Sequence, residues 1–235
     1  RSIAKFAIPA IISMLVSAMY NIVDQIFIGQ GLGMLGNAAT NVAFPVTTIA
    51  TALALLLGIG GASNYNLEMG AGQEKKASGI AGTALSSLVI SGLILAVIAL
   101  VFLKPLLTLF GATTDVMPYA VDYTGITALG LPFYILSVGG NHVVRADRSP
   151  TYSMTCIMIG AIINTILDPV FIFVFGWGIK GAAWATVIGQ VVSGVLVIVY
   201  FWKFRNMYLT GAMLKPKMPY LKAIISLGLA SCINQ

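Results

Sequence analysis

Apolar stretches long enough to cross a lipid bilayer recur along the whole of this chain. A membrane-spanning helix needs roughly 20 apolar residues. Six stretches meet that requirement, and a seventh begins near Tyr220. The six are Phe6–Ile28, Thr40–Tyr65, Ile80–Leu103, Met117–Val143, Tyr152–Phe175 and Gly181–Phe201. The sequence therefore predicts an all-α fold, a polytopic membrane helix bundle of six transmembrane helices plus the beginning of a seventh.

The composition excludes a water-soluble domain. Charged residues make up 9% of the chain and hydrophobic residues 58%, whereas a soluble domain carries about 25% charged residues. The formal charge of +6 does not indicate a nucleic-acid partner, because the basic residues lie between apolar stretches rather than on one soluble face. Cys156 and Cys232 each lie inside an apolar run, so we expect neither a disulfide nor a metal site there.

The distribution of Lys and Arg predicts the orientation in the membrane. Eleven of the 13 basic residues fall in the N-terminal segment and in the second, fourth and sixth connecting segments. The other side carries Lys104 and Lys180. Cytoplasmic loops retain an excess of Lys and Arg. We therefore expect a multi-pass protein of the cell (inner) membrane with a cytoplasmic N-terminus.

Four polar residues fall at one depth of the predicted bundle. At a rise of about 1.5 Å per residue, their distances from the helix ends place them together in the outer leaflet; they are Asp24, Tyr123, Asp168 and Thr186. Intramembrane acids are costly and usually mark ion or proton pathways. Asp24 and Asp168 are therefore candidates for such a pathway, and the alternative is that each lies at the interface or caps a helix end.

The sequence around Asp168 favours cation binding. Asn164 precedes Asp168 by four residues, so the amide and the carboxylate share one helix face. Pro169 removes the hydrogen bond that would reach the carbonyl of Thr165, which bends the helix and frees a backbone oxygen. Irregular backbone at membrane depth must be buried in protein or line a wet cavity. We expect a cavity near Asp168.

Other motifs do not predict chemistry. The run from Gly31 to Gly36 matches a dinucleotide-binding pattern, but it follows a membrane span rather than a strand, so we interpret it as a flexible outer loop. His142 is interpreted as a polar residue at a helix end. Small residues at four-residue spacing on the sixth span predict close helix packing; they are Gly181, Ala185, Gly189 and Ser193. Catalytic triads, zinc-ligand spacings and phosphate loops are not seen, so neither an enzyme nor a cofactor is expected.

Several segments together resemble a known family. They run from Asn21 to Gly29, from Asn141 to Asp147, from Asn164 to Ile172 and from Gly181 to Thr186. In these residues, and over essentially its whole length, the chain resembles the multidrug and toxic compound extrusion (MATE) transporters, particularly their bacterial branch. The resemblance implies two six-helix halves: a lobe at 1–205, a cytoplasmic linker at 206–219 and the start of the second lobe at 220–235. Arg1 is not an initiator residue and Gln235 stops inside an apolar run without a capping signal, so both ends are expected to be cut.

The resemblance also implies a site. Asp24, Asn164, Asp168 and Thr186 are similar to the family's cation or proton site in the N-terminal lobe, which would make them ligands of a possible Na⁺. Tyr123, Asn21 and Gln25 are expected near that site or the substrate cavity. The chain departs from the family at two positions. Arg148 stands where Gly is typical in the fourth loop, and Ala230 where Pro is frequent.

The function implied is secondary antiport. A transporter of this kind exports small organic, often cationic, compounds in exchange for Na⁺ or H⁺, and its partners are the bilayer and the C-terminal half of the same transporter. The sequence does not decide between the two coupling ions. Two alternatives stay open: a lipid-linked substrate flippase of the same superfamily, and a channel or membrane scaffold in which neither acid binds an ion.

Overall fold

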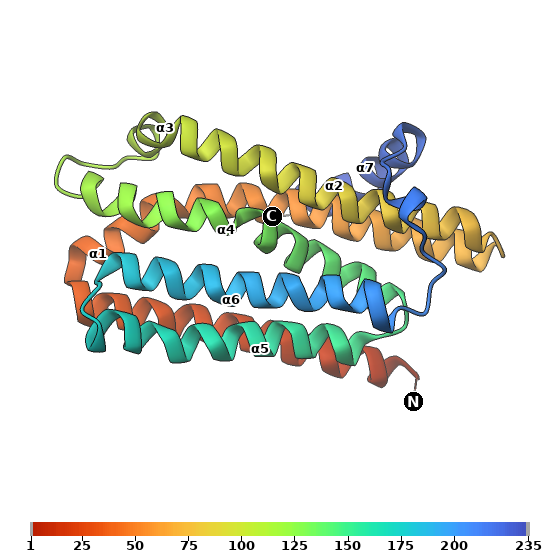
Figure 1. Cartoon of the computed structure of the whole chain (residues 1–235), viewed down its shortest axis with the longest axis horizontal. Helices are drawn as coiled ribbons and strands as arrows, with labels where there is room; N and C mark the ends of the chain where they lie inside the picture. The colour runs from red at the N-terminus through yellow and green to blue at the C-terminus, as the bar shows by residue number, and fades with distance from the viewer. Residues whose placement is uncertain (1, 234–235) are drawn as a thin grey trace.

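The computed structural model describes residues 2–233, with side chains at 7–203 and 205–229. Every regular element in the described residues is helical, and the long helices lie side by side along the long axis of the molecule (Figure 1). The side chains of Arg1, Lys5, Ala230 and Cys232 fall outside the described ranges, as do residues 234–235. The expectation of an all-α membrane bundle is confirmed.

The elements follow one another with short connections. Five of the helices are long and apolar enough to cross a membrane, and α1 accounts for two spans because it kinks at Gly33. In chain order they are α1 Ser2–Gly70, α2 Glu74–Val101, α3 Leu103–Leu109, α4 Met117–Ala146, α5 Pro150–Pro169, the π-helix η1 Val170–Val174, α6 Ile179–Val199, the π-helix η2 Tyr200–Phe204, the 3₁₀-helix η3 Gly211–Leu214 and α7 Met218–Ile233.

The first reversal of the chain is made inside α1. Gly33 has non-helical dihedrals, with φ 66° and ψ −151°, and α1 turns back on itself at this end of the bundle (Figure 1). Helical structure continues on both sides of Gly33, so the expectation of a flexible loop from Gly31 to Gly36 is wrong. Glycine populates this positive-φ conformation because it has no Cβ, and one residue is therefore sufficient for the turn.

The backbone is irregular where Pro169 ends α5. The following residues form the π-helix η1, in which the amide N–H of Phe175 donates to the carbonyl of Val170 at 2.9 Å. A proline removes one helical hydrogen bond and bends the chain. This change of helix type follows directly after Asp168, which lies in the last turn of α5.

Glycines bring α5 and α6 close together. A Cβ built on Gly160 would lie 2.9 Å from the carbonyl oxygen of Gly189, and one built on Gly189 would lie 2.8 Å from that of Gly160. Neither position has room for a side chain without a shift of the backbone. The packing expected of the small residues on the sixth span is present, and it holds Asn164 on α5 against Thr186 on α6.

The opposite end of the bundle is fastened at the corner after α4. Asp147 is 2% exposed and accepts hydrogen bonds from Tyr65, Tyr200 and the backbone N–H of Asn206. The next residue, Arg148, which stands where the family typically has Gly, has a φ of 64° and is therefore in the left-handed conformation. α7 packs on the second part of α1.

Candidate functional site

Asp24 and Asp168 meet inside the bundle. Asp24 comes from the first part of α1 and Asp168 from the last turn of α5, and their carboxyl groups lie within hydrogen-bonding reach of each other. Asp24 is 8% exposed and Asp168 is completely buried. The two helices therefore turn both acids inward, toward the same point, rather than toward lipid.

Most of the carboxylate oxygens at this point lack a donor. Both oxygens of Asp168 and Oδ1 of Asp24 are buried without a hydrogen-bond partner among the described residues, as is Oδ1 of Asn164. Two adjacent carboxylates repel each other when both are ionised, and a buried charge without a partner is strongly unfavourable. A proton or a cation shared by the pair would relieve both costs.

Polar groups from α4 and α6 complete the wall of the site. Nδ2 of Asn164 lies 3.5 Å from Oγ1 of Thr186, and the Thr186 hydroxyl in turn donates to the carbonyl of Ala182 at 3.0 Å. Tyr123 of α4 lies beside Thr186 and interacts with both acids. The structure thus brings Tyr123, Asn164 and Thr186 around the acid pair.

Tyr20 is a site residue that sequence reasoning missed. Its side chain interacts with Asp24 and with Asp168. The available signal was its position: Tyr20 precedes Asp24 by four residues and so shares one face of α1 with it. The prediction was based on charged residues and on their depth in the membrane, and it did not use this spacing.

The two other residues expected near the site differ in position. Gln25 interacts with Asp24, and its Oε1 accepts a hydrogen bond from Oγ1 of Thr40 at 3.2 Å. Asn21 is exposed, and its amide donates to the carbonyl of Ser17 at 2.7 Å. Both residues line a second hollow together with Asn37, and Gln25 in addition interacts with Asp24.

Other acidic and histidine side chains lie apart from the pair. Asp122, near the N-terminal end of α4, forms an exposed ion pair with Lys180 at 3.4 Å. Among the described residues, no three His, Cys, Asp or Glu side chains gather as a metal site. Carboxylate, amide and hydroxyl oxygens are instead the ligands that hard cations prefer.

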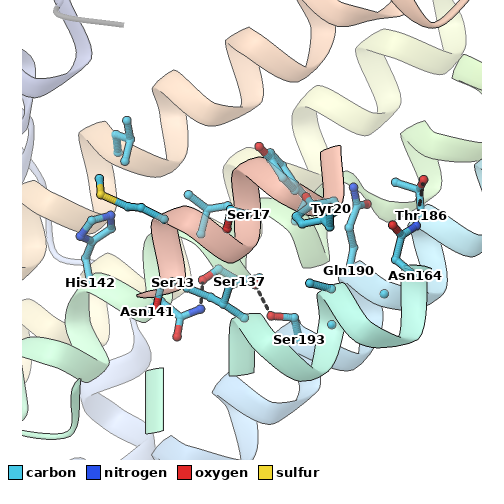
Figure 2. A pocket seen from close by; sticks show the side chains of 18 of the residues that line it. Ser13, Ser17, Tyr20, Ser137, Asn141, His142, Asn164, Thr186, Gln190 and Ser193 are labelled. Carbon is cyan, nitrogen blue, oxygen red and sulfur yellow. Dashed lines mark hydrogen bonds between the residues drawn. The ribbon is translucent and has the colours of Figure 1, made fainter. Parts of the chain in front are cut away.

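A groove lined by both polar and apolar side chains adjoins the acid pair. It has a volume of about 580 Å³ and is lined by residues of α1, α4, α5 and α6. Figure 2 shows its lining, from Thr186 and Asn164 at one end to His142 at the other. The groove thus extends the site from the layer of the acids toward the far end of the bundle.

Comparison with known proteins places this geometry in a family. The family model described as MatE matches residues 9–170. The chain belongs to the MatE family. It is 29% identical over 230 residues to the multidrug export protein MepA of Staphylococcus haemolyticus, and 28% identical to MepA of Staphylococcus aureus strain MRSA252. Each alignment covers 97% of this chain and 51% of the relative.

Solved structures of MATE transporters have the same fold as this chain. A multidrug resistance MATE transporter in an outward-facing conformation superposes with a TM-score of 0.90 at 30% identity, over 98% of this chain and 51% of that one. A MATE structure in the straight conformation gives 0.91 at 29% identity, over 99% and 52%. The chain therefore spans about half the length of the relatives it matches.

Proposed function

We propose that this chain is the N-terminal lobe of a secondary antiporter that exports organic, often cationic, compounds in exchange for Na⁺ or H⁺. The observation that carries the proposal is the contact between Asp24 and Asp168, two buried acids whose oxygens largely lack donors. Relatives named multidrug export proteins support the substrate class.

We propose that the chain is divided into a first lobe, a linker and the start of a second lobe. The lobe occupies residues 1–205, the linker 206–219 and the start of the second lobe 220–235. Relatives about twice as long as this chain support a second lobe as its partner. We also propose that the protein lies in the cell membrane with its N-terminus in the cytoplasm, because the basic residues concentrate on that side.

The acid pair supplies a physical basis for coupling. A cation or proton bound between Asp24 and Asp168, with Asn164 and Thr186 as further oxygen donors, would neutralise charge that is otherwise costly to bury. A conformation that encloses the site would then be favoured only when the ion is present. Differential ion affinity of two conformations is what shifts the equilibrium between them.

Transport in vesicles tests the proposal. Efflux of a fluorescent cationic dye would be measured in proteoliposomes of the complete transporter under a Na⁺ gradient and then under a pH gradient, with the other ion clamped each time. We expect one of the two gradients to drive efflux. Asp24→Asn should abolish that dependence, whereas Asp122→Asn, which alters an exposed ion pair, should retain it. Efflux that ignores both gradients would contradict the proposal.

The flippase alternative predicts a different site. A carrier of lipid-linked anions needs a basic, lipid-sized groove, whereas the site formed by Asp24 and Asp168 is acidic. Ion-coupled efflux retained by Asp24→Asn would favour this alternative, or a channel or scaffold role. Flipping of a lipid-linked substrate by the same vesicles would separate these functions.

A further inference from the structure

A separate groove, here named the lateral groove, lies between α2 and α6. It has a volume of about 530 Å³, and pockets that hold small molecules have roughly 300–1,000 Å³. In the described part of the chain it shares no lining residue with the groove of Figure 2. Its apolar lining comes from α2, α4, α6, η2 and the segment after η2, and includes Leu85, Val89, Leu136, Val197, Phe201 and Leu209.

The rim of the lateral groove is apolar and uncovered. Ile90 on α2 is 44% exposed, Ile198 on α6 is 46% exposed, and Trp202 in η2 is 82% exposed. On the side of a membrane-spanning bundle, exposed side chains of this kind suit hydrocarbon better than water. An aliphatic chain is therefore a better occupant of this groove than water is.

The segment after η2 forms one wall of the lateral groove through Leu209 and Leu214. This segment runs from the end of α6 past α2 toward α7 (Figure 1). It is held closely on α2, because the hydroxyl of Ser86 donates to the carbonyl of Leu214 and a Cβ built on Gly82 would collide with the carbonyl oxygen of Met213. The groove is thus bounded by part of the proposed linker.

Arg205 places a positive charge at one end of this apolar groove. One N–H group of its guanidinium donates to the carbonyl of Phe201 at 2.8 Å. The guanidinium offers five N–H donors in all, and its remaining ones have no partner among the described residues. The exposed Lys203 precedes it by two residues. None of the described residues that line the groove is acidic, so this charge is not neutralised by the protein.

The combination of groove and charge indicates the class of ligand. A guanidinium pairs with phosphate through two parallel N–H···O bonds, and the apolar walls suit an aliphatic chain. A phospholipid carries both groups in one molecule. The end of α6 lies on the side where the basic residues concentrate, and basic pockets between helices on the cytoplasmic side bind anionic lipid headgroups. A zwitterionic headgroup would instead bring its own cation close to Arg205 and Lys203.

We propose that the lateral groove binds one anionic phospholipid, with its phosphate on Arg205 and an acyl chain against Val89, Leu136 and Phe201. The bound lipid contacts α2, α6 and the segment after η2 at once, and so holds the proposed linker on the first lobe. This inference goes beyond the proposed antiport and does not depend on the coupling ion.

Fluorescence quenching at Trp202 tests the proposal. The complete transporter would be placed in phosphatidylcholine vesicles that contain increasing fractions of phosphatidylglycerol with dibrominated acyl chains, which quench indole fluorescence on contact. Brominated phosphatidylcholine gives the reference. The difference between the parent and Trp202→Phe isolates the signal of Trp202. Phosphatidylglycerol should be preferred about fivefold or more at this position, since that is the preference that one basic residue near the surface gives an anionic lipid.

Two variants and a matched control assign this preference to the guanidinium. Arg205→Gln should bring the two lipids to within about twofold of equal binding, and Arg205→Lys, which keeps the charge but not the paired donors, should retain part of the preference. Lys75→Gln removes an exposed positive charge on the same predicted side. Lys75 lies ten residues before Leu85, about 15 Å along α2 and beyond a screening length of about 10 Å, so this variant should keep the full preference.

The outcomes separate this inference from the proposed function. Equal quenching of Trp202 by the two lipids in the parent would overturn the site whether or not the variants fold, and so would an unchanged preference in folded Arg205→Gln. Absence of quenching by either brominated lipid would show that the second lobe or another copy covers the groove, which also excludes the site. Each of these results would leave ion-coupled efflux intact. Efflux that ignores both ion gradients would refute the antiport but not a preference for phosphatidylglycerol at Trp202.

Discussion

The hydroxyl of Tyr200, near the end of the sixth span, donates a 2.7 Å hydrogen bond to Oδ2 of Asp147, in the corner after α4. Oδ1 of the same carboxylate accepts from Tyr65 at 3.1 Å, and Oδ2 also accepts from the backbone N–H of Asn206 at 2.7 Å. One buried carboxylate thus joins α1, α4, η2 and the start of the proposed linker. Deletion of one donor should weaken all of these connections together.

Tyr200→Phe should destabilise the folded protein. The substitution removes a hydrogen bond to a charged acceptor and leaves Asp147 buried with one donor fewer, so we expect a loss of about 1.5–3 kcal/mol in the free energy of unfolding. Unfolding in mixed detergent micelles would measure it. Tyr208→Phe is the control, because Tyr208 is 65% exposed. Equal stabilities for the two variants would contradict the role assigned to Asp147.

Arg148→Gly should stabilise the protein. Arg148 is held at φ 64°, and a left-handed conformation costs a residue with a Cβ about 1–2 kcal/mol. The greater freedom of glycine in the unfolded chain offsets about 0.5–1 kcal/mol of that gain, so the net increase should be about 0.8 kcal/mol at the midpoints of the two ranges and at most about 1.5 kcal/mol. Arg148→Ala, which removes the charge but keeps a Cβ, should show no such increase in the same unfolding measurement.

The long membrane-spanning stretches were predictable from the sequence, because hydropathy determines which stretches can cross a bilayer. The reversal at Gly33 was not. A run rich in glycine is compatible with a loop, and also with two helices that meet at one residue, and packing around Ile28 and Ala39 favours the second arrangement. The short helix α3 was also not predicted, because it lies inside the segment expected to connect the third and fourth spans.

The sequence predicted how deep in the membrane the site residues lie, but not how far each helix is rotated about its own axis. Counting residues from the helix ends placed Asp24 and Asp168 in one layer, and the structure brings their carboxyl groups together. How far each helix turns about its axis depends on packing, such as the contact of Gly160 with Gly189. The depth of a residue along its helix does not give that rotation, whereas the four-residue spacing of Tyr20 and Asp24 did place these two residues on one face of α1. The binding roles of these residues stay a prediction.

Gly33→Ala should be costly without any clash. A Cβ at Gly33 would have no atom within 4 Å, so the effect comes from the backbone alone. At φ 66° and ψ −151° a residue with a Cβ is strained by about 1–3 kcal/mol. Gly70→Ala is a matched control, because that position also has open space but no positive φ. Equal thermal stability of the two variants would show that the reversal of α1 does not depend on glycine.

Asp168→Asn should separate coupling from folding. The amide keeps the shape of the side chain and removes an ionisable group that is buried completely, and a neutral amide is less costly to bury than an ionised acid. The thermal stability of the variant should therefore equal or exceed that of the parent.

Asp24 would remain as a single carboxylate beside a neutral amide, so the site could no longer hold two acids around one ion. Ion-driven dye efflux in proteoliposomes should fall to the level of empty vesicles, and stabilisation of the parent by the coupling ion, which follows from preferential binding to the folded state, should disappear. Asp122→Asn should retain both properties. Normal ion-coupled efflux by Asp168→Asn, in protein that folds as the parent does, would show that the pair of acids is not the coupling site.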